Sequence, residues 1–279
     1  MLFTIKRILV CSDLSANSEL VLRNAEQIRE RTGAQMDVLF VSDARTHHPY
    51  LDDESIRKIG LEAKIKLNDQ LMNLQIKGEL LFEEGDVAEK INNLIINGKE
   101  KYDLLLIGHN SRPGILQHIL GSTARRLLAS VSIPTLVIKS DMKFAKMGCL
   151  VDNTSPLGWM ITSSLDFYRS LKFDLIEFIN LWHELPEPFG NGGSSAEFKK
   201  HLEEEVKYFE HEKEKISIRV EPARELQVAG RLNQIIKEEK VDLAIMKRNR
   251  GKNMKTMLLG SETMRMLELD PINLLVLPV

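Results

Sequence analysis

Cysteine is scarce in this sequence, and its two occurrences exclude several kinds of site. Cys11 and Cys149 lie in separate apolar stretches, and neither belongs to a C-x-x-C pair or to a zinc-ligand spacing. Isolated cysteines in apolar surroundings are typical of buried, unreactive thiols in a reducing compartment. The sequence therefore predicts no disulfide and no cysteine-based metal centre.

Long apolar runs and an excess of one charge are also missing. No stretch approaches the roughly 18 apolar residues that a membrane span requires, and the apolar run within residues 1–13 is shorter than a secretory signal needs. The 38 lysine and arginine residues nearly balance the 40 acidic residues, so the net charge is only -2. Such a balance gives no support to binding of nucleic acid or of an anionic membrane. We expect a cytoplasmic protein without either partner.

An internal repeat organises the chain. When the sequence is shifted by 139 residues, ILVCSDLS at 8–15 falls on the first eight residues of MGCLVDNTS at 147–155. The same shift places residues 103–122 on residues 242–261 without a gap. It superimposes Asp13 on Asp152, Asp103 on Asp242, Gly121 on Gly260 and Ser122 on Ser261.

A constant offset at both ends of the repeat indicates two tandem copies of one domain. We place the first domain at residues 1–139, a linker at 140–146 and the second domain at 147–279. A chain of 279 residues is long enough for two domains that each bury a core.

Within the first copy, short apolar runs alternate with amphipathic segments. Near-continuous apolar runs are typical of a parallel sheet that is covered by helices on both faces, and they predict strands at 7–12, 36–42, 78–83, 103–108 and 134–139. Helices are predicted between them, from Ser15 to Arg31 closed by Gly33, from Asp53 to Ile76 closed by Gly78, from Asp86 to Lys101 with Asp86 as N-cap, and from Gly121 to Ser130. This alternation predicts a doubly wound α/β fold, whose ligand site lies beyond the carboxyl ends of the strands.

The segment after the fourth predicted strand has the composition of an anion site. Gly108 and Gly114 permit close approach of the backbone to a ligand, and Ser111 offers a hydroxyl donor. Gly121-Ser122 opens a helix, whose free N–H groups and dipole favour an anion. The spacing matches neither a Walker A loop nor G-x-G-x-x-G. The residues alone leave two interpretations open, a phosphate site and an ordinary structural loop.

Several motifs together resemble the universal stress protein family. They are the early strand ending in Asp13, the segment GDVAEKI before the third predicted helix, and a late loop close to G-x2-G-x9-G-[ST] that precedes IPTLVIK. The resemblance covers the chain as two tandem copies. It implies a five-stranded α/β domain with strand order 3-2-1-4-5 in each copy, and antiparallel pairing of the two copies through their last strands.

The resemblance also implies a ligand for the first copy. In ATP-binding members of that family, the loop glycines and the final serine or threonine hold phosphates and ribose. The aspartate after the first strand helps to place the nucleotide, and backbone at the end of the second strand meets adenine. Ser111 departs from the family pattern, which has glycine there. The implied site for ATP, with or without Mg²⁺, consists of Asp13, Val41, Gly108, Ser111, Gly121 and Ser122.

The second copy departs further from the family pattern. Lys247 stands where the first copy has Gly108, and Arg250 stands where it has Ser111. Two long side chains in place of small ones obstruct close approach of a ligand to the backbone. We predict a degenerate second site, formed by Asp152, Lys247, Arg250, Gly260 and Ser261.

Three functions remain open from the sequence. The first is a stress-response protein whose first domain binds ATP or a related adenine nucleotide as a regulatory or signalling ligand. The second is a slow ATPase, which is disfavoured because no Walker lysine and no catalytic dyad can be named. The third is a nucleotide-free scaffold or a module for a nonpolar ligand that acts through protein association. We favour the first function, expect no enzyme and no metal centre, and leave open whether tandem chains pair again as a homodimer.

Overall fold

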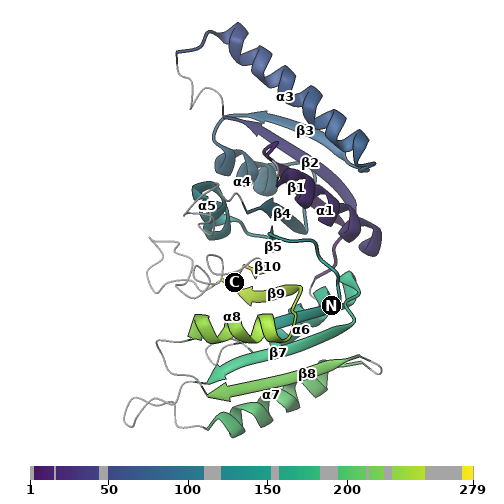
Figure 1. Cartoon of the computed structure of the whole chain (residues 1–279), viewed down its shortest axis with the longest axis vertical. Coiled ribbons are helices and arrows are strands. Elements are labelled where there is room, and N and C mark those ends of the chain that lie inside the picture. The colour runs from purple at the N-terminus through teal and green to yellow at the C-terminus, as the bar shows by residue number, and fades with distance from the viewer. Residues whose placement is uncertain are drawn as a thin grey trace.

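The fold is that of a computed structural model, which describes residues 3–15, 17–43, 50–109, 121–151, 157–182, 194–211, 214–222, 228–248 and 272–278. Its described strands form one ten-stranded sheet in the order β3-β2-β1-β4-β5-β10-β9-β6-β7-β8. Figure 1 shows the two halves of the chain lying end to end along this sheet. The expected α/β class is confirmed.

The first half contains the strand order that the sequence predicts, 3-2-1-4-5, and all its strands are parallel. Its elements follow one another as β1 (Arg7–Ser12), α1 (Ser18–Thr32), β2 (Gln35–Ser42), α3 (Asp53–Asn73), β3 (Glu79–Glu84), α4 (Val87–Asn97), β4 (Leu104–Gly108), α5 (Ser122–Ser130) and β5 (Thr135–Ile138).

The second half repeats the first in reversed order across the sheet. Its described elements are β6 (Lys146–Leu150), α6 (Leu157–Leu171), β7 (Leu175–Trp182), α7 (Ser195–Phe209), β8 (Ile216–Pro222), α8 (Val228–Glu238), β9 (Leu243–Lys247) and β10 (Asn273–Leu277). The strands of this half are also parallel to one another. The tandem duplication is therefore visible in the topology.

The two halves join through their last strands. β5 and β10 pair antiparallel, with Leu136 opposite Leu275 and Val137 opposite Leu274. This confirms the expected pairing within one chain. Because the pairing makes the sheet continuous, each face carries an apolar core that draws on both halves. One core includes residues of α1, α3, α6 and α7, and the other includes residues of α4, α5 and α8.

Two predicted helix ends are wrong in detail. The second helix of the chain, α3, ends at Asn73 and not at Ile76, because Gln75 already takes a positive φ of 54° and turns the chain before Gly78. α4 ends at Asn97 with Gly98 as its C-cap, short of Lys101. The predicted N-cap of α4 is confirmed, since the Asp86 carboxylate accepts the N–H of Glu89 at 2.9 Å.

Candidate functional site

Three of the predicted site residues lie at one edge of the sheet. Asp13 directly follows β1, Val41 is near the end of β2, and Gly108 ends β4. β1 lies between β2 and β4 in the sheet, and all three strands run in the same direction. The fold therefore brings these residues together at the carboxyl edge, as the sequence predicted for a doubly wound sheet.

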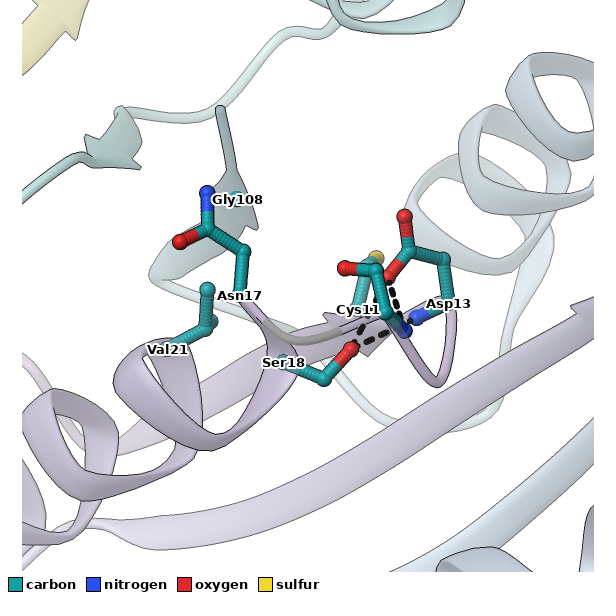
Figure 2. A pocket seen from close by; sticks show the side chains of 7 residues that line it. Cys11, Asp13, Asn17, Ser18, Val21 and Gly108 are labelled. Carbon is teal, nitrogen blue, oxygen red and sulfur yellow. Dashed lines mark hydrogen bonds between the residues drawn. The ribbon is translucent and has the colours of Figure 1, made fainter. Parts of the chain in front are cut away.

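A small hollow lies beside Asp13 and Gly108. Its lining comes from the end of β1, the first turn of α1 and the end of β4, as Figure 2 shows. The lining residues are Cys11, Asp13, Ser15, Asn17, Ser18, Val21 and Gly108. Val41, Gly121 and Ser122 are not among them.

The loop after β1 is shaped around the Asp13 carboxylate. Asp13 Oδ1 accepts the N–H of Ser15 at 3.0 Å and the hydroxyl of Ser18 at 2.8 Å. Leu14, between them, has a φ of 59°, which is the left-handed region that a residue with a side chain seldom adopts. A backbone conformation of this kind costs free energy and persists only where surrounding contacts hold it, often at ligand sites.

Asn17 connects the loops that follow β1 and β4. It stands immediately before α1, and its Nδ2 donates to the backbone carbonyl of His109. The backbone N–H of His109 donates in turn to the carbonyl of Ile138 on β5, at 3.1 Å. In Figure 2 the Asn17 side chain extends toward Gly108. The sequence analysis missed Asn17 and Ser18, although a polar run between a strand and a helix is a usual place for caps.

The two glycines of the site have different roles. A Cβ on Gly108 would lie 3.0 Å from Cγ2 of Val21, so a side chain there would press on α1. A Cβ on Gly121 would meet no atom of the described residues within 4 Å, and its φ of -57° suits any L-residue. Nothing in the described fold requires a glycine at position 121, which is the N-cap of α5. Among the described residues, no atom fills the space beside Gly121, which lies at a helix N-terminus where an anion is favoured.

The Cys11 thiol is held in its protonated form. Burial, with a smaller contribution from the nearby Asp13 carboxylate, raises its pKa to about 12. Burial likewise raises the pKa of Cys149 to about 12. A thiol of that pKa is a poor nucleophile near neutral pH. Both cysteines are free of disulfides, as the sequence predicted.

In the described part of the chain, no three His, Cys, Asp or Glu side chains lie close enough together to hold a metal ion. None of the described helices combines the length and the apolar character needed to cross a bilayer.

The described residues do not include Asp152, Arg250, Gly260 and Ser261 of the second predicted site, or Ser111 of the first. Lys247 is described and ends β9, the position that Gly108 has in β4.

Arg248, the residue after Lys247, has a structural role that the sequence did not indicate. Its side chain is buried, and its Nη1 donates to the carbonyls of Leu128 at 3.1 Å, Ala129 at 3.1 Å and Val131 at 2.9 Å. These carbonyls belong to the last turn of α5, where a cation also complements the helix dipole. The second half thus caps the helix whose other end carries Gly121.

Comparisons with known proteins agree with the fold. Residues 4–139 match the profile of the universal stress protein family. The stress response protein NhaX of Bacillus subtilis is 27% identical over 99 residues, a match that covers 36% of this chain and only 56% of that protein.

Solved structures match over nearly the whole length. A universal stress protein from Archaeoglobus fulgidus covers 99% of both chains with a TM-score of 0.75 and 19% identity. A putative universal stress protein from Pseudomonas aeruginosa has a TM-score of 0.64 and 16% identity, with 98% of this chain and 93% of that chain covered. At such identities these two structures show a shared two-copy fold.

Proposed function

Because residues 4–139 belong to the universal stress protein family, we propose that the first half of this chain binds an adenine nucleotide as a regulatory ligand in a cytoplasmic stress response. ATP, with or without Mg²⁺, is the proposed ligand. The observation that carries the proposal is the open space beside Gly121 at the start of α5.

Phosphate oxygens suit that place for two reasons. The first N–H groups of a helix have no intrahelical acceptor, and the helix dipole adds a partial positive charge. Ser122 is exposed at the first helical position and adds a hydroxyl donor. A glycine at position 121 lets a phosphate approach the backbone closely, since no Cβ stands in the way.

The hollow beside Asp13 and Gly108 would take the sugar side of the nucleotide. Asp13 is exposed, and its carboxylate is held in place by Ser15 and Ser18, so it is oriented before a ligand arrives. Preorganisation of this kind lowers the entropic cost of binding. The backbone of Val41, at the end of β2, is the proposed neighbour of adenine.

The side chains of the hollow favour nucleotide binding without rapid hydrolysis of the nucleotide. The Cys11 thiol is protonated, and Asp13 already accepts two hydrogen bonds from its own loop. Neither is arranged as a general base toward a water molecule. We therefore propose a nucleotide that signals by occupancy.

A pair of glycine substitutions tests the proposal. We expect Mg-ATP at about 100 times its dissociation constant to stabilise the wild type by about 2.7 kcal/mol, and Gly121→Ala to remove most of that stabilisation while the unliganded protein stays folded. Gly230→Ala is the matched control, because its Cβ also meets no atom within 4 Å and it lies in α8 of the other half. Thermal denaturation with and without nucleotide gives the readout.

Titration calorimetry on the same proteins measures stoichiometry. We expect about one nucleotide per chain, since the second site is proposed to be degenerate. A wild type that shows neither heat nor stabilisation at millimolar ATP would refute nucleotide binding and leave the scaffold function.

A further inference from the structure

α3 carries an apolar stripe that the fold does not use. Leu61, Ile65 and Met72 are 59%, 53% and 69% exposed, respectively. A neighbouring face of the same helix packs into the core through the buried Leu67 and Leu71. Figure 1 places α3 at one end of the molecule, beside the edge strand β3. The stripe therefore faces away from the body of the protein.

The spacing of this stripe is that of a coiled-coil seam. Leu61, Ile65, Asn68 and Met72 follow one another at intervals of four, three and four residues, which corresponds to heptad positions d, a, d and a. Leucine at d with isoleucine at a favours a two-stranded assembly. Asn68 lies within the seam, with Nδ2 at 3.6 Å from Sδ of Met72.

The charges beside the seam select an orientation. The heptad puts Arg57 and Lys64 on one flank, at position g, and Glu62 and Asp69 on the other, at position e. In a parallel two-fold pair, each g residue faces the e residue five positions later in the other helix. Arg57 would then meet Glu62 of the second copy, and Lys64 would meet Asp69 of the second copy.

In an antiparallel pair, the charges beside the seam would repel one another. It brings flank g against flank g and flank e against flank e, so basic side chains would face basic ones and acidic side chains would face acidic ones. All four charged side chains are exposed, and within the described part of the chain none of them is in an ion pair. Like charges across the seam would disfavour that arrangement.

The corresponding helix of the second half has no such stripe. α7 exposes one large apolar side chain, Tyr208, and its charges include the i,i+4 pairs Lys199–Glu203 and Lys200–Glu204. The shared fold therefore does not demand an apolar outer face on this helix.

We propose that a second copy of this chain docks on α3 as a parallel, two-fold-symmetric helix pair through the seam of Leu61, Ile65, Asn68 and Met72. The contact is isologous, so the same patch serves both chains. The seam is short, with four residues on each helix, whereas stable complexes bury at least ~1,200 Å². The dimer is therefore expected to be weak and concentration-dependent. This inference does not depend on nucleotide binding.

Sedimentation velocity of the full chain tests the association. We expect the mass to rise from the 31.8 kDa of one chain toward twice that value over a series from about 1 µM to about 1 mM. Ile65→Lys should keep the protein monomeric throughout, and folding should persist because the side chain is exposed. Ile59→Lys is the control, since Ile59 is exposed on α3 outside the seam. A monomeric wild type, or an Ile65→Lys variant that dimerises like it, would overturn the proposal.

Cross-linking and charge exchange test the orientation. Asn68→Cys should form a disulfide-linked dimer on oxidation, because the parallel pair puts the two copies of position 68 side by side, whereas the exposed control Lys66→Cys should not. Lys64→Asp should weaken association by about tenfold, and adding Asp69→Lys should restore it. No cross-link at position 68, or no rescue by the double exchange, would overturn the parallel arrangement.

Discussion

The two halves of this chain share a scaffold but differ at the end of their fourth strand. In the first half β4 ends in Gly108, beside a hollow that reaches Asp13. In the second half β9 ends in Lys247, and the next residue, Arg248, turns into the first half to cap α5. The comparison indicates that one copy keeps a strand end suited to a ligand, while the other uses it for assembly.

What the halves retain in common is the amino edge of the sheet. Asp103 accepts the backbone N–H groups of Lys6 and Arg7 at 2.8 and 2.9 Å. Asp242 does the same for Ala145 and Lys146, at 2.7 and 3.0 Å. The aspartate before each fourth strand thus anchors the start of the first strand, which explains why it survives in both copies.

A buried carboxylate on the second strand is also repeated. Asp37 in β2 is bound by Arg7 at 2.8 Å and by the hydroxyl of Tyr102 at 2.7 Å. Glu177 in β7 is bound by Lys146 at 2.7 Å and by Arg219 at 2.9 Å. The first strand supplies the cation in both halves, so the ion pair is part of the scaffold and not of either ligand site.

The largest expected effect comes from removing the contact of Arg248 with the end of α5, through which the second half caps a helix of the first. Arg248→Met should lower the free energy of unfolding by about 3 kcal/mol, because three carbonyls at the end of α5 lose a charged donor. Urea denaturation measures this loss. Arg126→Met, on the exposed side of α5 and paired with Asp86 at the surface, should cost about 0.5 kcal/mol. Equal costs for the two variants would contradict the capping role.

A somewhat smaller effect should follow from exchanging the strand ends. Gly108→Lys gives the first half the residue of the second, and we expect it to remove the nucleotide stabilisation of about 2.7 kcal/mol at saturating ATP. The lysine would crowd Val21 and extend into the hollow. Lys247→Gly in the other half should leave this stabilisation unchanged. The readout is the shift in thermal denaturation with ATP, and a loss in both variants would mean that the halves are not independent sites.

The smallest effect concerns acid stability in the second half. Lys146, which donates to Glu239, lowers the pKa of that carboxyl below its usual 4.5, and the charge of Arg219 lowers it further. A lowered native pKa gives stability that is present above the unfolded value and is lost as pH falls through the native one. Glu239→Gln should therefore cost about 1 kcal/mol at pH 7 and progressively less as the pH falls below the usual value of 4.5.

The first half provides the matched control for that pH profile. Glu100 pairs with Arg7 in the equivalent place but is 56% exposed. We expect Glu100→Gln to cost less than about 0.5 kcal/mol at pH 7, when unfolding is followed across the pH range. A cost for Glu239→Gln that stays constant down to pH 3 would contradict the linkage.

The sequence by itself determined the architecture of this protein. Apolar runs at strand length and an offset of 139 residues predicted five strands per copy, and the resemblance predicted their order and the pairing of β5 with β10. The strand positions follow from local periodicity repeated along the chain, whereas the strand order and the pairing were implied by the resemblance. Helix ends were less predictable, because Gln75 and Gly98 turn the chain for reasons of local backbone conformation that composition does not carry.

Only the tertiary structure decided which side chains act across the halves and which face the solvent. Nothing in the segment around Arg248 indicates that its guanidinium reaches the end of a helix 120 residues earlier. The contact of Asn17 with His109 and the outward face of Leu61 and Ile65 are equally invisible in the sequence. Periodicity shows that a helix has apolar positions. Which of them are buried depends on how two copies pack around one sheet, since that packing alone sets the distance between residues far apart in the chain.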